Sequence, residues 1–72
     1  MIIKILETPA HENGSIRAKW FTAIKRYDGK SVDDFVAATT KKPPVLNKHG
    51  EGEAPNGWVG YFEREEVIQL VE

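Results

Sequence analysis

The sequence predicts an α+β fold in which two helices pack on a small antiparallel sheet, in the order β-α-α-β-β-β. Residues 15–39 contain two amphipathic stretches joined by a tight turn, and this pattern predicts the two helices. Runs of β-branched and aromatic residues near both ends of the chain predict the strands. Helices that cover one face of such a sheet form a two-layer domain. A hairpin after the two helices also leaves a winged-helix-like arrangement open.

The first helix is predicted to begin after Ser15, whose hydroxyl can cap the first turn, and to stop at Asp28-Gly29. Its apolar side chains fall on one stripe at helical spacing. The stripe contains Ile16, Trp20, Ala23, Ile24 and Tyr27. The rest of its surface carries basic side chains and no acidic one. These are Arg17, Lys19, Lys25 and Arg26.

The second helix has a predicted N-cap at Ser31, and Asp33 and Asp34 lie in its first turn, where the helix dipole favours negative charge. Its apolar face is short. The face contains Val32, Phe35, Val36 and Thr39. Lys41-Lys42-Pro43-Pro44 ends the helix, because a residue before proline is disfavoured in the helical conformation.

The segments before and after the two helices are predicted as follows. Residues 1–7 form a strand, and residues 8–14, which include Pro9 and Asn13-Gly14, form a loop. After the helices, residues 44–47 form a short strand or extended anchor. Residues 48–56 are rich in glycine and proline and have little to bury, so they are predicted to form a mobile loop.

The end of the chain is predicted to form a hairpin from strands at residues 58–62 and 67–71. The last segment has an alternative, a helix over residues 63–71 with glutamates in its first turn. Its β-branched residues favour the strand.

Composition and charge limit the possible functions. The chain of 72 residues is predicted to form one domain over residues 1–72, and it has no cysteine for a disulfide or a thiolate metal site. No apolar run is long enough for a membrane span, so we expect a cytoplasmic protein. The net charge is −1 but uneven: residues 1–42 hold eight basic and five acidic side chains, and residues 43–72 hold two and six.

The sequence predicts no enzyme and no catalytic, cofactor-binding or metal-binding residue. Asp33 and Asp34 are adjacent on a helix, so they point in different directions and fit the role of first-turn acids better than that of a catalytic pair. The two clusters of histidine with acid, His11-Glu12 and His49-Gly50-Glu51, lie in predicted loops, and each has too few ligands for a metal on its own.

Nucleic-acid binding is one hypothesis, because phosphate contacts need cations and a helix–turn–helix often carries them. The candidate residues are Arg17, Lys19, Lys25, Arg26, Lys30, Lys41 and Lys42. The second helix opposes direct reading of bases, since it is acidic at its start and has no arginine, asparagine or glutamine.

Protein binding is the other hypothesis, and it rests on aromatic side chains that a small core does not fully cover. An alternating strand over residues 58–62 places Trp58 and Phe62 on the face opposite Val59 and Tyr61. Exposed aromatics mark interfaces. The candidate residues are Phe21, Trp58 and Phe62.

Several features of the chain form a recognisable combination: a basic first helix, an Asp-Gly turn, a hydroxyl-Val-acid-acid-aromatic helix start and a late Gly-aromatic-aliphatic strand. The residues are Arg17, Trp20, Tyr27-Asp28-Gly29-Lys30-Ser31-Val32-Asp33-Asp34-Phe35 and Gly57-Trp58-Val59. In these features the chain resembles small uncharacterised proteins of phage and prophage origin. Its longer loop over residues 41–56 and its extra aromatic strand depart from that pattern. The resemblance implies a small non-enzymatic accessory protein and identifies no site residues.

The sequence therefore favours a binding module whose partner is another protein, with nucleic-acid binding through the basic first helix as the alternative. It predicts no membrane association and leaves the oligomeric state open.

Overall fold

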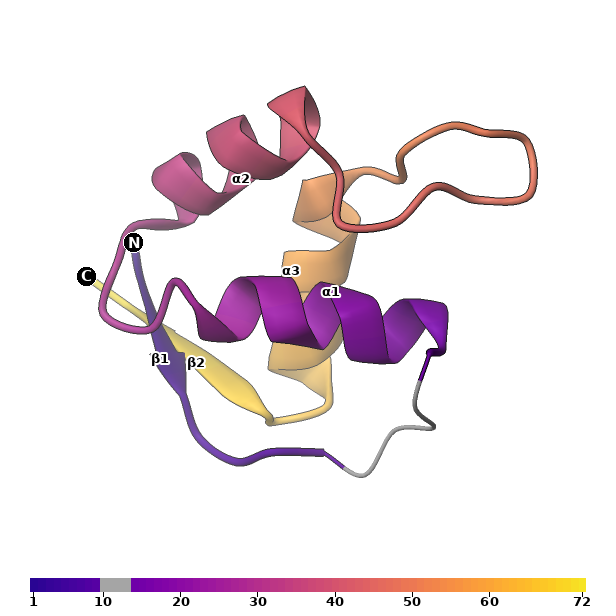
Figure 1. Cartoon of the computed structure of the whole chain (residues 1–72). Helices are drawn as coiled ribbons and strands as arrows, with labels where there is room; N and C mark the ends of the chain where they lie inside the picture. The colour runs from indigo at the N-terminus through magenta and orange to yellow at the C-terminus, as the bar shows by residue number, and fades with distance from the viewer. Residues whose placement is uncertain (10–13) are drawn as a thin grey trace.

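A computed structural model describes residues 1–9 and 14–72, and its elements follow the order β-α-α-α-β (Figure 1). They are β1 (Ile2–Ile5), α1 (Ile16–Lys25), α2 (Val32–Lys41), α3 (Pro55–Arg64) and β2 (Ile68–Val71). The α+β class is confirmed, but the predicted order is not. Of the loop predicted over residues 8–14, residues 10–13 lie outside the described residues, and so does the His11-Glu12 cluster.

Strand β1 is bonded along both of its edges. It pairs antiparallel with β2, so that Ile3 lies opposite Leu70, and the two chain ends lie side by side (Figure 1). On the other edge, the Ile3 amide donates to the Lys30 carbonyl at 2.8 Å, and the Gly29 amide donates to the Ile3 carbonyl at 2.7 Å. Gly29 has φ of 82°, which glycine adopts without strain. The Asp-Gly turn therefore ends α1 and also fixes its position on the sheet.

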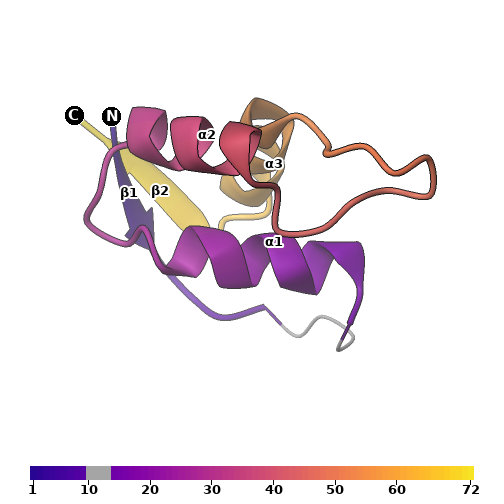
Figure 2. The same cartoon turned by 45° about the horizontal axis from the view of Figure 1, so that its top comes forward.

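Helices α1 and α2 run antiparallel and form the predicted helical pair (Figures 1 and 2). Both predicted N-caps are confirmed: Ser15 Oγ accepts from the Ala18 amide at 3.1 Å, and Ser31 Oγ accepts from the Asp34 amide at 3.0 Å. Neither helix, nor α3, is long and apolar enough to cross a membrane, and the described residues contain no other helix.

One connected aromatic cluster forms the centre of the molecule and contains all seven aromatic side chains of the chain. Trp20 stacks on Trp58 and meets Phe35 edge to face, so it joins α1 to both other helices. The remaining contacts link Phe21 to Phe62, Tyr27 to Phe35, Trp58 to Tyr61 and Phe62, and Tyr61 to Phe62. Ile3, Trp20, Ile24 and Phe35 are fully buried in the core, and Ile5 and Val36 pack against it partly buried.

The strand predicted over residues 58–62 is wrong, because these residues form part of helix α3. Pro55 occupies the first turn, where its missing amide costs no hydrogen bond. The apolar residues from Trp58 to Phe62 are spaced i, i+1, i+3 and i+4, which is one helix face, and Val59 and Phe62 are buried. The terminal hairpin therefore does not form from these residues, and the winged-helix-like arrangement is not confirmed.

The strand predicted over residues 67–71 is confirmed as β2, whereas the one predicted over residues 44–47 is reduced to a single bridge between Leu46 and Gly52. The predicted loop that follows contains a hydrogen-bonded turn and ends at the start of α3. Asn47 organises this turn, since its Oδ1 accepts from the amides of His49 at 2.9 Å and Glu51 at 3.0 Å. The segment projects from the body of the molecule in both views (Figures 1 and 2).

Candidate anion-binding groove

The basic face predicted for the first helix is present and faces solvent. All seven predicted cations are exposed: Arg17, Lys19, Lys25, Arg26, Lys30, Lys41 and Lys42. Among the described residues, none of these cations forms an ion pair with a carboxylate. Their charges are therefore available to an external anion.

Four of these cations line two adjoining hollows between α1 and the end of α2, which together we treat as one groove. Its two halves have volumes of about 430 and 420 Å³ and share Ala23, Arg26 and Pro44 in their lining. The cations are Lys19, Arg26, Lys30 and Lys42. The other described lining residues are small, hydroxyl-bearing or proline residues together with Tyr27, and none of those within residues 1–9 and 14–72 is acidic. We call this feature the basic groove.

The local sequence explains why these side chains meet. Lys19 lies in α1 and Arg26, seven residues later, is the C-cap of that helix, which places them on the same side about two turns apart. Ala23 lies between them and has too short a side chain to fill the space. Pro43 and Pro44 end α2 and return the chain across α1, so that they form part of the opposite wall with Lys42.

Tyr27 is the aromatic side chain of the groove, and it is half-buried. Its ring meets Phe35 edge to face at a centroid distance of 5.5 Å, which fixes its orientation from the core side. Lys30 Nζ lies over the same ring, 5.7 Å from its centroid. The groove therefore combines cations with one oriented aromatic ring.

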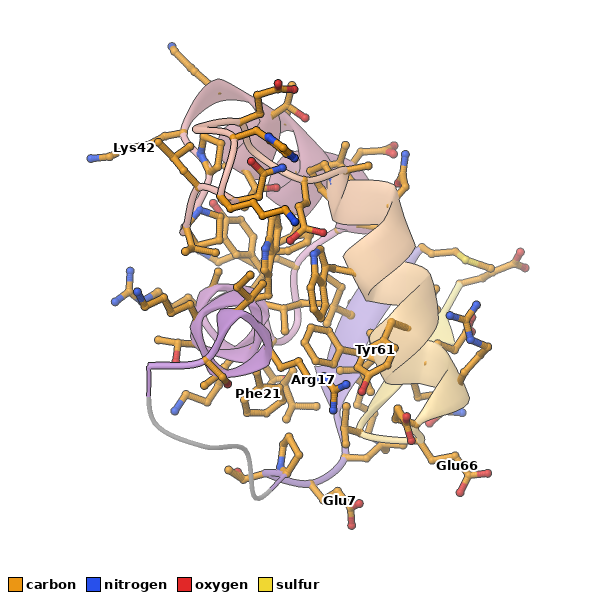
Figure 3. The ribbon with its side chains drawn as sticks, turned by 90° about the vertical axis from the view of Figure 1, so that its right-hand side faces the viewer. Glu7, Arg17, Phe21, Lys42, Tyr61 and Glu66 are labelled. Carbon is orange, nitrogen blue, oxygen red and sulfur yellow. The ribbon has the colours of Figure 1, made fainter. Side chains whose placement is uncertain are left out.

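The other three predicted cations do not line the groove. The Arg17 guanidinium lies over the ring of Tyr61, 5.7 Å from its centroid, between α1 and α3 (Figure 3). Lys25 and Lys41 are exposed and line neither half of the groove. The seven predicted cations therefore do not form a single patch, because four line the basic groove and three lie outside it.

Of the acidic side chains, Glu7, Glu65 and Glu66 lie away from the groove. In Figure 3 Lys42 projects on one side of the molecule, whereas Glu7 and Glu66 lie at the opposite, lower end. Glu65 lines a separate hollow with Glu7 and Arg17. The acidic second half of the chain thus contributes no carboxylate to the lining of the basic groove.

Two of the three predicted protein-binding aromatics are core residues. Phe21 is 5% exposed and Phe62 is fully buried. Trp58 is half-buried and lines a shallow hollow on α3, together with Tyr61 and Glu53. The alternating pattern assumed for a strand misplaced these side chains, and the helical spacing of the same residues would have put Phe62 in the core.

Sequence reasoning missed Tyr27 and the proline pair as parts of a site. Tyr27 belonged to the apolar stripe, and Pro43 and Pro44 were interpreted only as a helix stop. The only sign of their role in the sequence is that Tyr27 follows Arg26 and that the two prolines follow Lys42.

The other candidate sites are a catalytic acid pair and a metal site. Asp33 and Asp34 are exposed in the first turn of α2. Over residues 1–9 and 14–72, no three histidine or acidic side chains come together as a metal site requires.

Comparisons with known proteins do not extend this picture. No family model matches the chain, and no curated protein or solved structure gives a significant match. The resemblance to phage and prophage proteins therefore stays a prediction.

Proposed function

We propose that this protein is a non-enzymatic cytoplasmic module that binds nucleic acid by holding phosphates in the basic groove. The observation that carries the proposal is the convergence of Lys19, Arg26, Lys30 and Lys42 on one groove, to whose lining the described part of the chain adds no acidic residue. Cations without a carboxylate partner can contact phosphates. Each such contact is favourable because it releases condensed counterions.

Two findings support our choice of nucleic acid over a protein partner. The acidic residues after residue 42 would repel a polyanion if they lined the groove, but none of them does. Phe21 and Phe62, on which protein binding depended, contribute to the core instead. We therefore favour nucleic acid as the partner and keep a protein partner as the second candidate.

Binding of this kind is expected to be weak and independent of sequence. Helix α2 presents Asp33 and Asp34 at its start and carries no arginine, asparagine or glutamine to read base edges. We expect a Kd within the usual non-specific range of about 10⁻⁴–10⁻⁶ M at physiological salt.

Matched pairs of substitutions test whether the groove is the site. Arg26→Gln with Lys42→Gln removes two charges from the groove, and Lys25→Gln with Lys41→Gln removes two from the adjacent positions of the same segments. By fluorescence anisotropy with a labelled oligonucleotide, we expect the groove pair to weaken binding by about tenfold or more and the control pair by about twofold at most. Equal losses would mean that only net charge matters and would contradict the proposal.

Protein binding remains the second candidate, through the hollow on α3. Half-buried Trp58 and Tyr61 line it beside Glu53, so it suits an apolar side chain flanked by a cation. A Cβ added at Gly57, which also lines the hollow, meets no atom within 4 Å, so Gly57→Leu places a bulky side chain at the hollow without a clash at its Cβ. We expect the native protein to capture a partner from nuclease-treated lysate. We expect Gly57→Leu to lose that partner. Capture that is unchanged by the substitution would exclude this hollow.

A further inference from the structure

We infer that the groove takes a single nucleic-acid strand and stacks one base on Tyr27, in preference to a duplex. This inference rests on the proposed function, because it specifies the ligand of the same groove. It depends on the place of Tyr27 among the cations and on the shape of the basic surface.

Tyr27 has the properties of a stacking platform. Tyr27 lines the groove and is half-buried, so part of the residue is accessible to a ligand there. Phe35, which is fully buried, packs against it at 5.5 Å and an interplanar angle of 72°, so the ring is held in place before a ligand arrives. A base that stacks on a preoriented ring orders fewer protein groups on binding.

Lys30 supplies the accompanying charge. Its ammonium lies over the Tyr27 ring at 5.7 Å from the centroid, and the residue is exposed. A stacked base would take the place of the ammonium over the ring, and the lysine would then contact the phosphate of that strand. Arg26 lines both halves of the groove and extends the cationic track toward Lys19. Aromatic platforms within a cationic groove are the usual means of binding single strands.

The shape of the surface disfavours a duplex. Duplex recognition by a helix–turn–helix inserts the second helix into the major groove. Here that helix is α2, whose exposed first turn carries Asp33 and Asp34, and these would meet phosphates. The cations instead line a concave groove between two helices, where a flexible strand with unpaired bases can enter.

Three probes of about 15 nucleotides, at the upper end of the range of one small site, separate stacking from charge. They are an oligothymidylate, an abasic strand with the same number of phosphates, and a duplex. We expect the native protein to bind the oligothymidylate about five- to 150-fold more tightly than the abasic strand, the range for one stacked base, and more tightly than the duplex. We expect Tyr27→Phe to keep this preference and Tyr27→Leu to lose it. The salt dependence of oligonucleotide binding should be unchanged in both variants.

The outcomes distinguish failure of the single-strand inference from failure of the proposed phosphate binding. Equal binding of the oligothymidylate and the abasic strand, or tighter binding of the duplex, would overturn the single-strand inference and leave the phosphate groove standing. A preference that persists in Tyr27→Leu would overturn the role of Tyr27. Failure of all three probes to bind would overturn the proposed function itself. The comparison of probes on native protein remains decisive even if Tyr27→Leu does not fold.

Discussion

The indole rings of Trp20 and Trp58 stack with their centroids 5.8 Å apart and an interplanar angle of 13°. Trp20 is fully buried on α1 and Trp58 is half-buried on α3, so this pair joins two helices that are distant in sequence. The Trp20 Nε1–H is buried and has no hydrogen-bond acceptor among residues 1–9 and 14–72, so Trp20 contributes through the packing of its ring.

Replacing Trp20 should therefore unfold or severely destabilise the protein. Trp20→Ala removes the contacts with Trp58 and Phe35 and leaves a cavity, at a cost of about 3–5 kcal/mol. Stabilities of small domains are of that size. Trp20→Phe keeps an aromatic ring and loses no hydrogen bond, so it should cost clearly less. Thermal melts followed by circular dichroism measure both, and a Trp20→Ala midpoint within a few degrees of native would show that the core is assigned wrongly.

Helix α3 can be tested at Gly57. This glycine is helical, its φ is not positive, and an added Cβ meets nothing within 4 Å. Gly57→Ala should therefore stabilise the protein by about 0.5–1 kcal/mol. Gly29→Ala is the opposite control, because φ of 82° strains any L side chain. Urea denaturation measures both, and a destabilised Gly57→Ala variant would argue against a helix over these residues.

The projecting turn around Asn47 should show local protection from amide exchange. Its side chain accepts from two amides, and the Gly50 amide donates to the Asn47 carbonyl at 2.9 Å. Asn47→Ala should accelerate exchange at His49 and Glu51 and leave global stability nearly unchanged, since the turn is exposed. Hydrogen exchange followed by NMR measures this at single residues. Native amides that exchange there as fast as in an unstructured peptide would return this segment to the mobile loop predicted from sequence.

Much of the fold follows from local signals in the sequence. Ser15 and Ser31 cap the two predicted helices, and Gly29 supplies the turn between them, so these elements depend on neighbouring residues alone. Residues 58–62 were mispredicted because their aromatic and β-branched content suggests a strand, while burial against α1 and α2 selects the helix. Propensity is local, whereas the choice here depends on tertiary packing.

The candidate site was predictable only in part, for a similar reason. The cations were evident, and Arg17 and Arg26 look equivalent in the sequence. Which of them converge depends on how α1 rotates against α2 and α3, and that rotation is set by the packing of Trp20. Arg17 consequently lies over Tyr61, and Arg26 lines the basic groove.

The most direct test of the basic groove is the salt dependence of oligonucleotide binding, measured for the native protein, Arg26→Gln and Lys25→Gln. Four phosphate contacts predict a slope of about −3 for log affinity against log salt with a single strand, at about −0.7 per contact. Arg26→Gln should make the slope shallower by about 0.7, and Lys25→Gln should leave it unchanged. A native slope near zero, or the same change in both variants, would contradict phosphate binding in the groove.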